Sequence, residues 1–203
     1  MKVTMLLFLL LGLVFTTLGS YYIFKSTRSS HRNRYRGTCS IPVRSSQRNL
    51  TEKVEIDDQM EVINVPKFDE NDEATFIHNF EREVSVIKDD TDKVCYMLPL
   101  DTEKIPQPQG FLDIIYGLES GLYLLDPETI RSDYQVDHPA LPKADIPFLY
   151  GDYIADACSN HTSYTLSERS FDLSTTTDIM IMFGKKYVVF PGGQFVLQYH
   201  IRL

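Results

Sequence analysis

The sequence predicts an α+β domain preceded by one transmembrane helix. Three patterns support this prediction: an N-terminal apolar run of bilayer length, several short β-prone segments, and two stretches whose apolar residues recur every three or four positions. The chain has 203 residues, of which 43% are hydrophobic, so it can form one domain with its own core. With 10 Gly, 10 Pro and 3 Cys, its composition excludes a collagen-like protein and a small disulfide scaffold.

The apolar run covers residues 3–24 and contains no charged side chain. About 20 apolar residues cross the hydrocarbon core of a bilayer, and Tyr21 and Tyr22 would lie at the membrane interface. We therefore expect residues 1–24 to be a signal-anchor with a single span. A cleaved signal peptide is the alternative, because the small residues Gly19 and Ser20 offer a cleavage site.

Charge divides the rest of the chain into two parts. Residues 25–48 carry seven basic and no acidic side chains, whereas residues 49–203 carry 12 Lys and Arg against 28 Asp and Glu. The acidic part argues against nucleic acid as a partner. The basic run beside the span favours a cytosolic C-terminus. The glycosylation sequons at Asn49 and Asn160 instead favour a lumenal or extracellular one, so the residues alone leave the orientation open.

Residues 25–52 lack periodicity and are predicted to be a basic, flexible stalk, after which strands and helices alternate up to about residue 170. The clearest element is a hairpin, in which 83–88 and 93–98 are strands and the Asp-rich 89–92 is the turn. Further strands are expected at 54–56, 60–65, 131–136 and 163–166, and amphipathic helices at 111–123 and 146–158.

The C-terminal tail, residues 171–203, is strongly β-prone. Residues 178–183, 187–190 and 195–199 are predicted strands, and Pro191-Gly192-Gly193 predicts a hairpin between the last two. Such segments aggregate when they are left unpaired. The tail is therefore either a client that the domain shields, or the strands that complete its sheet. The side chains that would mark it as a client are Tyr187, Val188, Val189, Phe190, Phe195, Val196 and Leu197.

Three cysteines imply one internal pair and one left over if the chain is lumenal. The split favoured by their positions joins Cys95 to Cys158 and leaves Cys39, in the stalk, for an intermolecular disulfide in a homodimer. Three free thiols in a cytosolic domain are the alternative.

The sequence indicates no catalytic, metal or cofactor site, so we do not expect an enzyme. It contains no nucleophile elbow, no pair of metal-ligating histidines and no glycine-rich phosphate loop. Asp90-Thr91-Asp92 matches the D-x-D pattern of Golgi sugar transferases, which leaves a small transferase as a remote alternative.

Four motifs occur in a characteristic order: Val65–Phe68 (VPKF), Phe76–Phe80 (FIHNF), Asp92–Leu100 (DKVCYMLPL), and Phe148–Tyr150 ahead of Cys158. In this order they resemble a BRICHOS domain of the integral membrane protein 2 family. The resemblance implies a five-stranded antiparallel sheet flanked by two helices over residues 53–170, and a Cys95–Cys158 bridge. Its motif residues are His78, Asn79, Phe80, Tyr96 and Pro99.

The resemblance also implies a type II glycoprotein of the endoplasmic reticulum, Golgi and plasma membrane. Its lumenal domain would bind β-prone segments, including its own tail and amyloid-β-type peptides, as a chaperone does. A membrane glycoprotein for trafficking or adhesion, without chaperone activity, is the alternative.

Three departures from the family pattern bear on this expectation. Asn79 replaces the family's aspartate, so a carboxylate that could titrate is missing there. No cysteine follows Cys158, and the tail is preceded by no furin site, Lys185-Lys186 being dibasic but within the β-prone stretch. Release of a C-terminal peptide is therefore in doubt.

Overall fold

The computed structural model describes residues 35–43, 46–122, 126–169 and 184–203. The signal-anchor expected over residues 1–24 and the strand expected over 178–183 lie outside the described residues. Among the helices that are described, none is long and apolar enough to span a bilayer.

Ten strands form one sheet in the described part of the chain. The first six are β1 (Tyr35–Pro42), β2 (Asn49–Ile56), β3 (Met60–Val65), β4 (Ala74–Asn79), β5 (Val84–Asp89) and β6 (Val94–Pro99). After α2 (Pro108–Glu119) come β7 (Glu128–Val136), α3 (Ile146–Tyr150), α4 (Asp152–Ala157), β8 (Thr162–Glu168), β9 (Gly184–Val189) and β10 (Phe195–Arg202).

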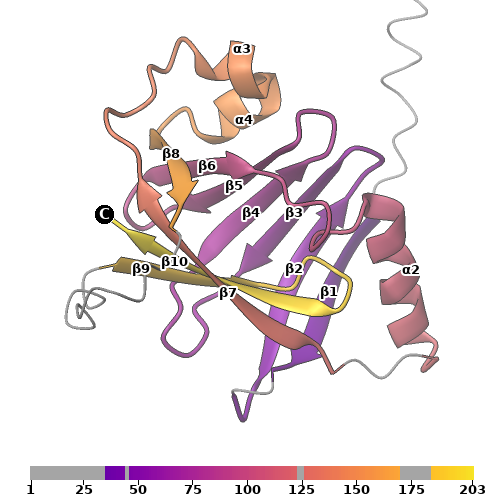
Figure 1. The fold of residues 1–203 in the computed structure, drawn as a ribbon. Coiled ribbons are helices and arrows are strands. Elements are labelled where there is room, and N and C mark those ends of the chain that lie inside the picture. Colours follow the sequence, from indigo (N-terminus) through magenta and orange to yellow (C-terminus); the bar gives the residue numbers. More distant parts are fainter. Residues whose placement is uncertain (1–34, 44–45, 123–125, 170–183) are drawn as a thin grey trace, which may run out of the picture. The chain divides into compact units, whose positions relative to one another are not determined.

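The spatial order of the strands is β1-β2-β3-β4-β5-β6-β8-β7-β10-β9. The first six form an antiparallel meander, whereas β8 lies parallel to β6 and β10 lies parallel to β7. The sheet curls, so that β7, β10 and β9 cross in front of the meander (Figure 1). The last two strands of the chain are therefore the last two in the sheet order.

Local turn chemistry accounts for the β5–β6 hairpin, as the sequence predicted. The Oδ1 atom of Asp89 accepts hydrogen bonds from the backbone N–H groups of Thr91 (2.8 Å) and Asp92 (2.9 Å). An aspartate that bonds the backbone two residues ahead fixes a tight turn. Lys93 closes the turn with a positive φ of 56°.

The sheet buries side chains on both faces, which explains the nearly unbroken burial of β5 and β6. The larger apolar cluster fills the space between the meander, α2 and the β9–β10 hairpin, and includes Phe76, Phe111 and Phe190. The smaller cluster lies under α3 and α4 on the other face, around Cys95 and Cys158. The tail is thus part of the main core rather than an appendage.

The predicted fold class was wrong. The described domain is mostly β, with a curled ten-stranded sheet and three short helices, and it is not a five-stranded sheet flanked by two helices. The difference arises because β1 and the first half of β2 come from the predicted stalk, and β9 and β10 come from the predicted tail. These strands extend the sheet at its two ends, where β2 pairs with β3 and β10 pairs with β7.

Two predicted elements also need correction. The stalk was expected to be flexible, but residues 35–42 form β1 and β2 begins at Asn49; Cys39 and Ile41 alternate with exposed residues and are buried. The helix expected over 146–158 is two short helices, because Gly151 between them has a φ of 92°, which ends the right-handed turn.

Candidate functional site

The edge of β7 carries the C-terminal tail. Strand β10 pairs with it in parallel from Phe195 opposite Glu128 to Arg202 opposite Gln135, whereas β8 pairs only with residues 134–136. Because β8 lies on the opposite edge of β7, β10 is the strand that covers the tail-facing edge in the described sheet. An unpaired strand edge binds another extended segment through backbone hydrogen bonds.

The direction of the β7 backbone groups follows from two hydrogen bonds. The N–H of Glu128 donates to Gln194 O (3.0 Å), on the side of β10. The carbonyl of Asp133 accepts from Arg169 N (2.9 Å), on the side of β8. The backbone N–H and C=O groups of successive residues point to alternate edges of a strand. In β7, the N–H and C=O groups of even-numbered residues such as Ser132 therefore point toward β10, and those of odd-numbered residues such as Arg131 point away from it.

The tail side chains predicted to mark a client segment lie in the core. All of them except Phe195, which is half-buried, are at most 4% exposed. The ring of Tyr187 lies 6.3 Å from that of Tyr96, and the ring of Phe190 lies 5.9 Å from that of Phe111 on α2. The tail therefore covers apolar surface on both the sheet and the helix.

The turn of the tail hairpin packs closely on α2. Gly192 and Gly193 have positive φ angles of 79° and 98°. A Cβ atom on Gly192 would lie 2.6 Å from the ring of Phe111, so a side chain there would force the turn away from the helix. The Pro-Gly-Gly turn signal thus also has a packing role that the sequence did not reveal.

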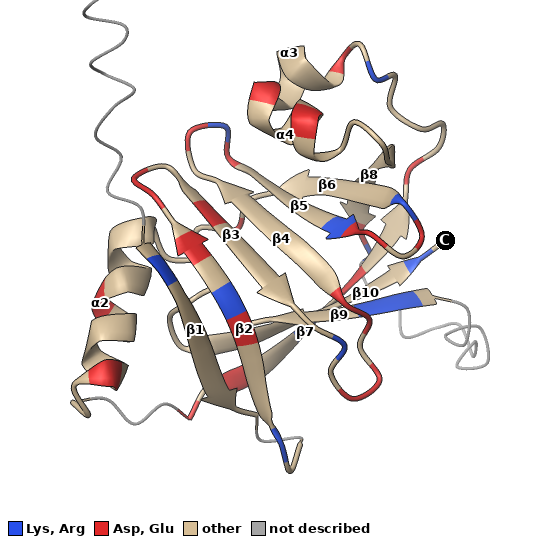
Figure 2. Ribbon diagram, turned by 180° about the vertical axis from the view of Figure 1, so that it is seen from behind, with Lys and Arg blue, Asp and Glu red and all other residues tan. Residues whose placement is uncertain are grey.

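Carboxylates of the meander hold strand β9. Figure 2 shows the basic part of β9 beside the acidic loop between β3 and β4. The Nζ atom of Lys185 lies 2.6 Å from an oxygen of Asp92, 3.4 Å from Asp89 and 3.7 Å from Asp72. The hydroxyl of Tyr187 donates to Asp89 at 2.7 Å. Burial alone would raise the pKa of Asp89, but the hydrogen bonds from the Asp92 amide and Tyr187, together with the charge of Lys185, hold it below the ordinary value.

The backbone of β9 is held as well. The carbonyl of Lys186 accepts a hydrogen bond from Asp72 N (2.7 Å), and the N–H of Phe190 donates to the carboxyl of Glu52 (2.7 Å). Glu52 is fully buried, and this is the one partner of its carboxyl within the described residues. Burial raises the pKa of Glu52 to about 8, so at neutral pH the group is mostly protonated.

Two motif residues, His78 and Asn79, stay inside or beside the sheet in structural roles. His78 is fully buried, and its Nδ1 lies 2.9 Å from the Ser85 hydroxyl. Burial lowers the pKa of His78 to about 3. Glu61 lies directly opposite on β3, and burial raises its pKa to about 9. Asn79 accepts a hydrogen bond from Arg82 N (3.0 Å) and so closes the β4–β5 turn.

The other motif residues separate in space. Tyr96 is buried against the tail, Phe80 is half-buried at the end of the core, and Pro99 is exposed at the end of β6. The motif therefore combines one tail contact with residues that shape the sheet.

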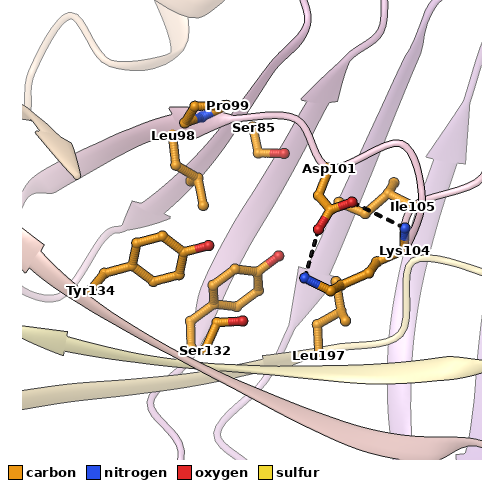
Figure 3. Close-up of a pocket in the computed structure, with 10 residues that line it drawn as sticks. Ser85, Leu98, Pro99, Asp101, Lys104, Ile105, Ser132, Tyr134 and Leu197 are labelled. Atoms are coloured by element: carbon orange, nitrogen blue, oxygen red, sulfur yellow. Dashed lines mark hydrogen bonds and ion pairs between the residues drawn. The ribbon is translucent and has the colours of Figure 1, made fainter. Parts of the chain in front are cut away.

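A small cavity lies between the meander and β7 and β10 (Figure 3). Its volume is about 10 Å³, which is room for about one water molecule. Ser85, Tyr134 and Leu197 line it, and the ion pair between Lys104 and Asp101 (2.6 Å) lies beside them. A cavity of this size is a packing feature and cannot hold a cofactor.

The cysteines form one disulfide and leave one free thiol, as the sequence predicted. Cys95 and Cys158 form a disulfide, and Cys39 is free and buried. Burial raises the pKa of the Cys39 thiol to about 12. The intermolecular disulfide stays a prediction, and it requires β1 to open first, because Cys39 is 6% exposed.

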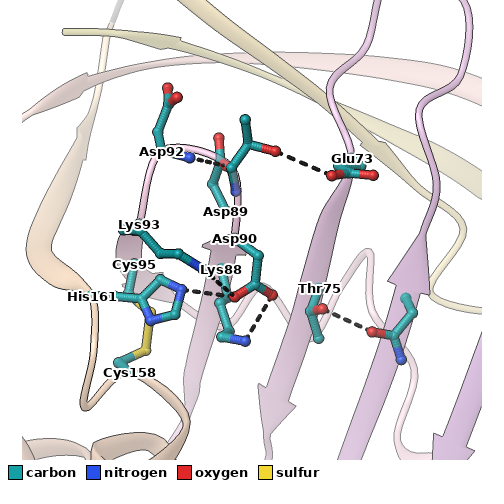
Figure 4. A network of polar contacts seen from close by, with 12 residues as sticks. Glu73, Thr75, Lys88, Asp89, Asp90, Asp92, Lys93, Cys95, Cys158 and His161 are labelled. Atoms are coloured by element: carbon teal, nitrogen blue, oxygen red, sulfur yellow. Dashed lines mark hydrogen bonds and ion pairs between the residues drawn. A yellow bond between two sulfur atoms is a disulfide. The ribbon is translucent and has the colours of Figure 1, made fainter.

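The remaining polar candidates lie near the disulfide or on the surface. Asp90, the first residue of the D-x-D pattern, contacts Lys88 (2.8 Å) and the ring of His161 (2.9 Å), and Thr91 donates to Glu73 (Figure 4). Asp90 is therefore engaged in an ion pair with Lys88, and Glu73 in a hydrogen bond with Thr91. Asn49 and Asn160 are both exposed, so the two predicted glycosylation sites are accessible in the folded chain.

Sequence reasoning missed the carboxyls that contact the tail. Glu52 stands among inward-facing Leu50, Val54 and Ile56, so strict two-residue alternation would have placed it in the core. The contacts of Lys185 had no such signal, because they join segments that are far apart in the chain.

Comparisons with known proteins give one family. Residues 70–165 match the BRICHOS domain. The chain is 29% identical to integral membrane protein 2C of Homo sapiens over 172 residues, which cover 80% of this chain and 62% of the relative. Identity to the proteins of the same name is 28% for Mus musculus and 27% for Rattus norvegicus, with the same coverage. The chain thus spans less than two thirds of the length of these curated relatives. No solved structure matches it.

Proposed function

This chain is a BRICHOS-domain protein of the integral membrane protein 2 family, and from this premise we propose that its sheet binds extended β-prone segments as a chaperone does. Its own tail is the first such segment, and amyloid-type peptides are further clients. The role is binding and shielding, not catalysis.

One observation carries the proposal: the tail is added at the end of the sheet, on β7. Strands β10 and β9 follow β7 in the sheet order, and the matched family region ends at residue 165, before either strand begins. Removing the tail would leave the first eight strands paired in their present order. It would also uncover a strand edge and apolar side chains, which is the surface that a β-prone peptide needs.

The proposed location is the secretory pathway and plasma membrane. The relatives are named integral membrane proteins, and the uncharged residues 3–24 would anchor this chain as a type II protein with its C-terminus lumenal or extracellular. The Cys95–Cys158 bridge supports this assignment, because disulfides persist in oxidising compartments.

The test uses a peptide of residues 178–203 and a chain truncated after residue 177. The truncated chain should slow fibrillation of the peptide at substoichiometric ratio, measured by dye fluorescence, and should do so more strongly than the full chain, whose edge is occupied. Intact far-UV circular dichroism and the intact disulfide establish that the truncated chain is folded. If it leaves fibrillation unchanged, chaperone-like binding is refuted.

A matched pair of variants tests the β7 edge itself. Ser132→Pro removes an N–H that points toward the added strand, whereas Arg131→Pro removes one that points away. The first substitution should abolish suppression of fibrillation, and the second should largely keep it. Equal effects of the two would mean that the peptide binds elsewhere.

An exposed apolar surface on α3 and α4 favours a second candidate function, which is adhesion or trafficking by binding a folded partner protein. Phe148 is 84% exposed, and Leu149 and Tyr153 are 48% and 44% exposed, all on α3 and α4. Two results together would favour this function. The full chain would capture a folded ectodomain and lose this binding in Phe148→Ser, and it would have no effect on fibrillation.

A further inference from the structure

We infer that Asp72, Asp89 and Asp92 form a site that selects extended segments carrying a lysine and, two residues later, a tyrosine. We call these three carboxylates the lysine–tyrosine site. The inference rests on the proposed function and specifies its substrate class: a β-prone strand with the pattern Lys-x-Tyr followed by apolar residues, as in Lys185–Phe190.

The site is formed by two turns of the meander. Asp72 lies in the loop between β3 and β4, Asp89 is the last residue of β5, and Asp92 lies in the turn between β5 and β6. The Nζ atom of Lys185 lies within 4 Å of oxygens from all three carboxylates. Three acidic groups around one cation repel each other when it leaves, so a segment without a basic residue would be disfavoured here.

Tyr187 is recognised by the innermost carboxylate. The side chain of Asp89 is 1% exposed, and one of its oxygens accepts from the Tyr187 hydroxyl at 2.7 Å. When a buried carboxylate oxygen loses its hydrogen-bond donor, that hydrogen bond no longer offsets the free-energy cost of removing the oxygen from water. Phenylalanine at this position would fill the same space next to Tyr96 but would leave that oxygen without the hydroxyl. The site therefore distinguishes tyrosine from phenylalanine.

The two contacts also fix the register of the bound strand. Side chains two residues apart lie on the same face of a strand, so Lys185 and Tyr187 reach the site together, and a shift by one residue would turn both away. Glu52 holds the other end through the N–H of Phe190. Phe190 follows Lys185 by five positions, which is about 17 Å along an extended strand. The segment is thus fixed at both ends.

The adjacent lysine provides the control. Lys186 contacts Glu70, whose side chain is 86% exposed, and an exposed ion pair contributes little to stability. Lys186→Gln removes the same charge from the same strand as Lys185→Gln but leaves the lysine–tyrosine site intact.

The first experiment measures hydrogen exchange of residues 184–190 in the full chain. Lys185→Gln and Tyr187→Phe should each increase the exchange rate about tenfold. Lys186→Gln should increase it by less than about threefold, and Lys185→Arg should restore most of the protection. Equal exchange in Lys185→Gln and Lys186→Gln would overturn the inference.

The second experiment separates this inference from the proposed function. A fluorescent peptide of residues 184–193 is added to the full-length Lys185→Gln chain, whose own tail is weakened. The inference predicts that the peptide binds at least about tenfold more tightly than a version with Gln in place of the first lysine. Equal binding of both peptides would refute the selectivity, and binding of neither would refute the inference. The proposed function concerns the β7 edge that β10 covers, so the fibrillation test with the truncated chain decides it separately.

Discussion

Loss of the Cys95–Cys158 disulfide should lower the free energy of unfolding by about 4 kcal/mol. The bridge joins β6 to the residue after α4 across a sequence separation of 63. Closing a loop of that length restricts the unfolded chain, and the chain-entropy relation gives about 4 kcal/mol. The loss should act most strongly on α3 and α4, which have five and six residues and are too short to be stable alone.

The assay is urea unfolding of the oxidised full chain and of the Cys95→Ala, Cys158→Ala double variant. Cys39→Ala is the control, because it removes a buried thiol that forms no disulfide and should cost about 1 kcal/mol. In the double variant, the rate of hydrogen exchange should increase most over residues 146–158. If the double variant is within about 1 kcal/mol of the control, the entropic reasoning is wrong.

Three further predictions follow from buried or exposed side chains. Because burial raises the pKa of Glu61 from 4.5 to about 9, the folded chain keeps a proton that the unfolded chain loses, and stability should fall as the pH rises across that range. Glu61→Gln should make this slope shallower, leaving the part that Glu52 contributes up to about pH 8, and should raise the free energy of unfolding at pH 8 by roughly 1–3 kcal/mol; an unchanged slope in pH-dependent urea titrations would contradict it. The Cys39 thiol should react with iodoacetamide at least roughly a hundredfold more slowly in the folded chain than in urea, since labelling needs local opening; fast labelling of the folded chain would show that β1 is open. Endoglycosidase treatment of cell-expressed chain should increase its gel mobility, and Asn49→Gln together with Asn160→Gln should abolish the shift; no shift in the wild type would argue against lumenal exposure.

Features set by neighbours in the chain could be predicted from the sequence. The β5–β6 hairpin depends on Asp89 and its own turn, and the tail hairpin on its Pro-Gly-Gly signal, so local chemistry sufficed for both. The helix expected over 111–123 is present as Pro108–Glu119, with Phe111 and Ile115 on its buried face. Paired cysteines were also predictable, because few pairings are possible.

Features set by distant partners could not be predicted in the same way. The parallel pairings of β6 with β8 and of β7 with β10 have no turn signal, because parallel strands are joined by long crossovers. The stalk was misassigned because β1 buries only alternate residues such as Cys39 and Ile41 and so carries a weak pattern. The acidic contacts of Lys185 depend on the same long-range pairing, and they were missed for the same reason.

The parallel β7–β10 ladder has a consequence for how the chain is made. Phe195 follows Val136 by 59 residues, and at ordinary synthesis rates this distance takes roughly 3 to 12 seconds to translate. During that interval the nascent domain presents β7 without the strand that finally covers it. We therefore expect neighbouring nascent copies on one polysome to compete with the chain's own C-terminus for that strand, and crowded translation to increase the fraction of strand-exchanged dimers.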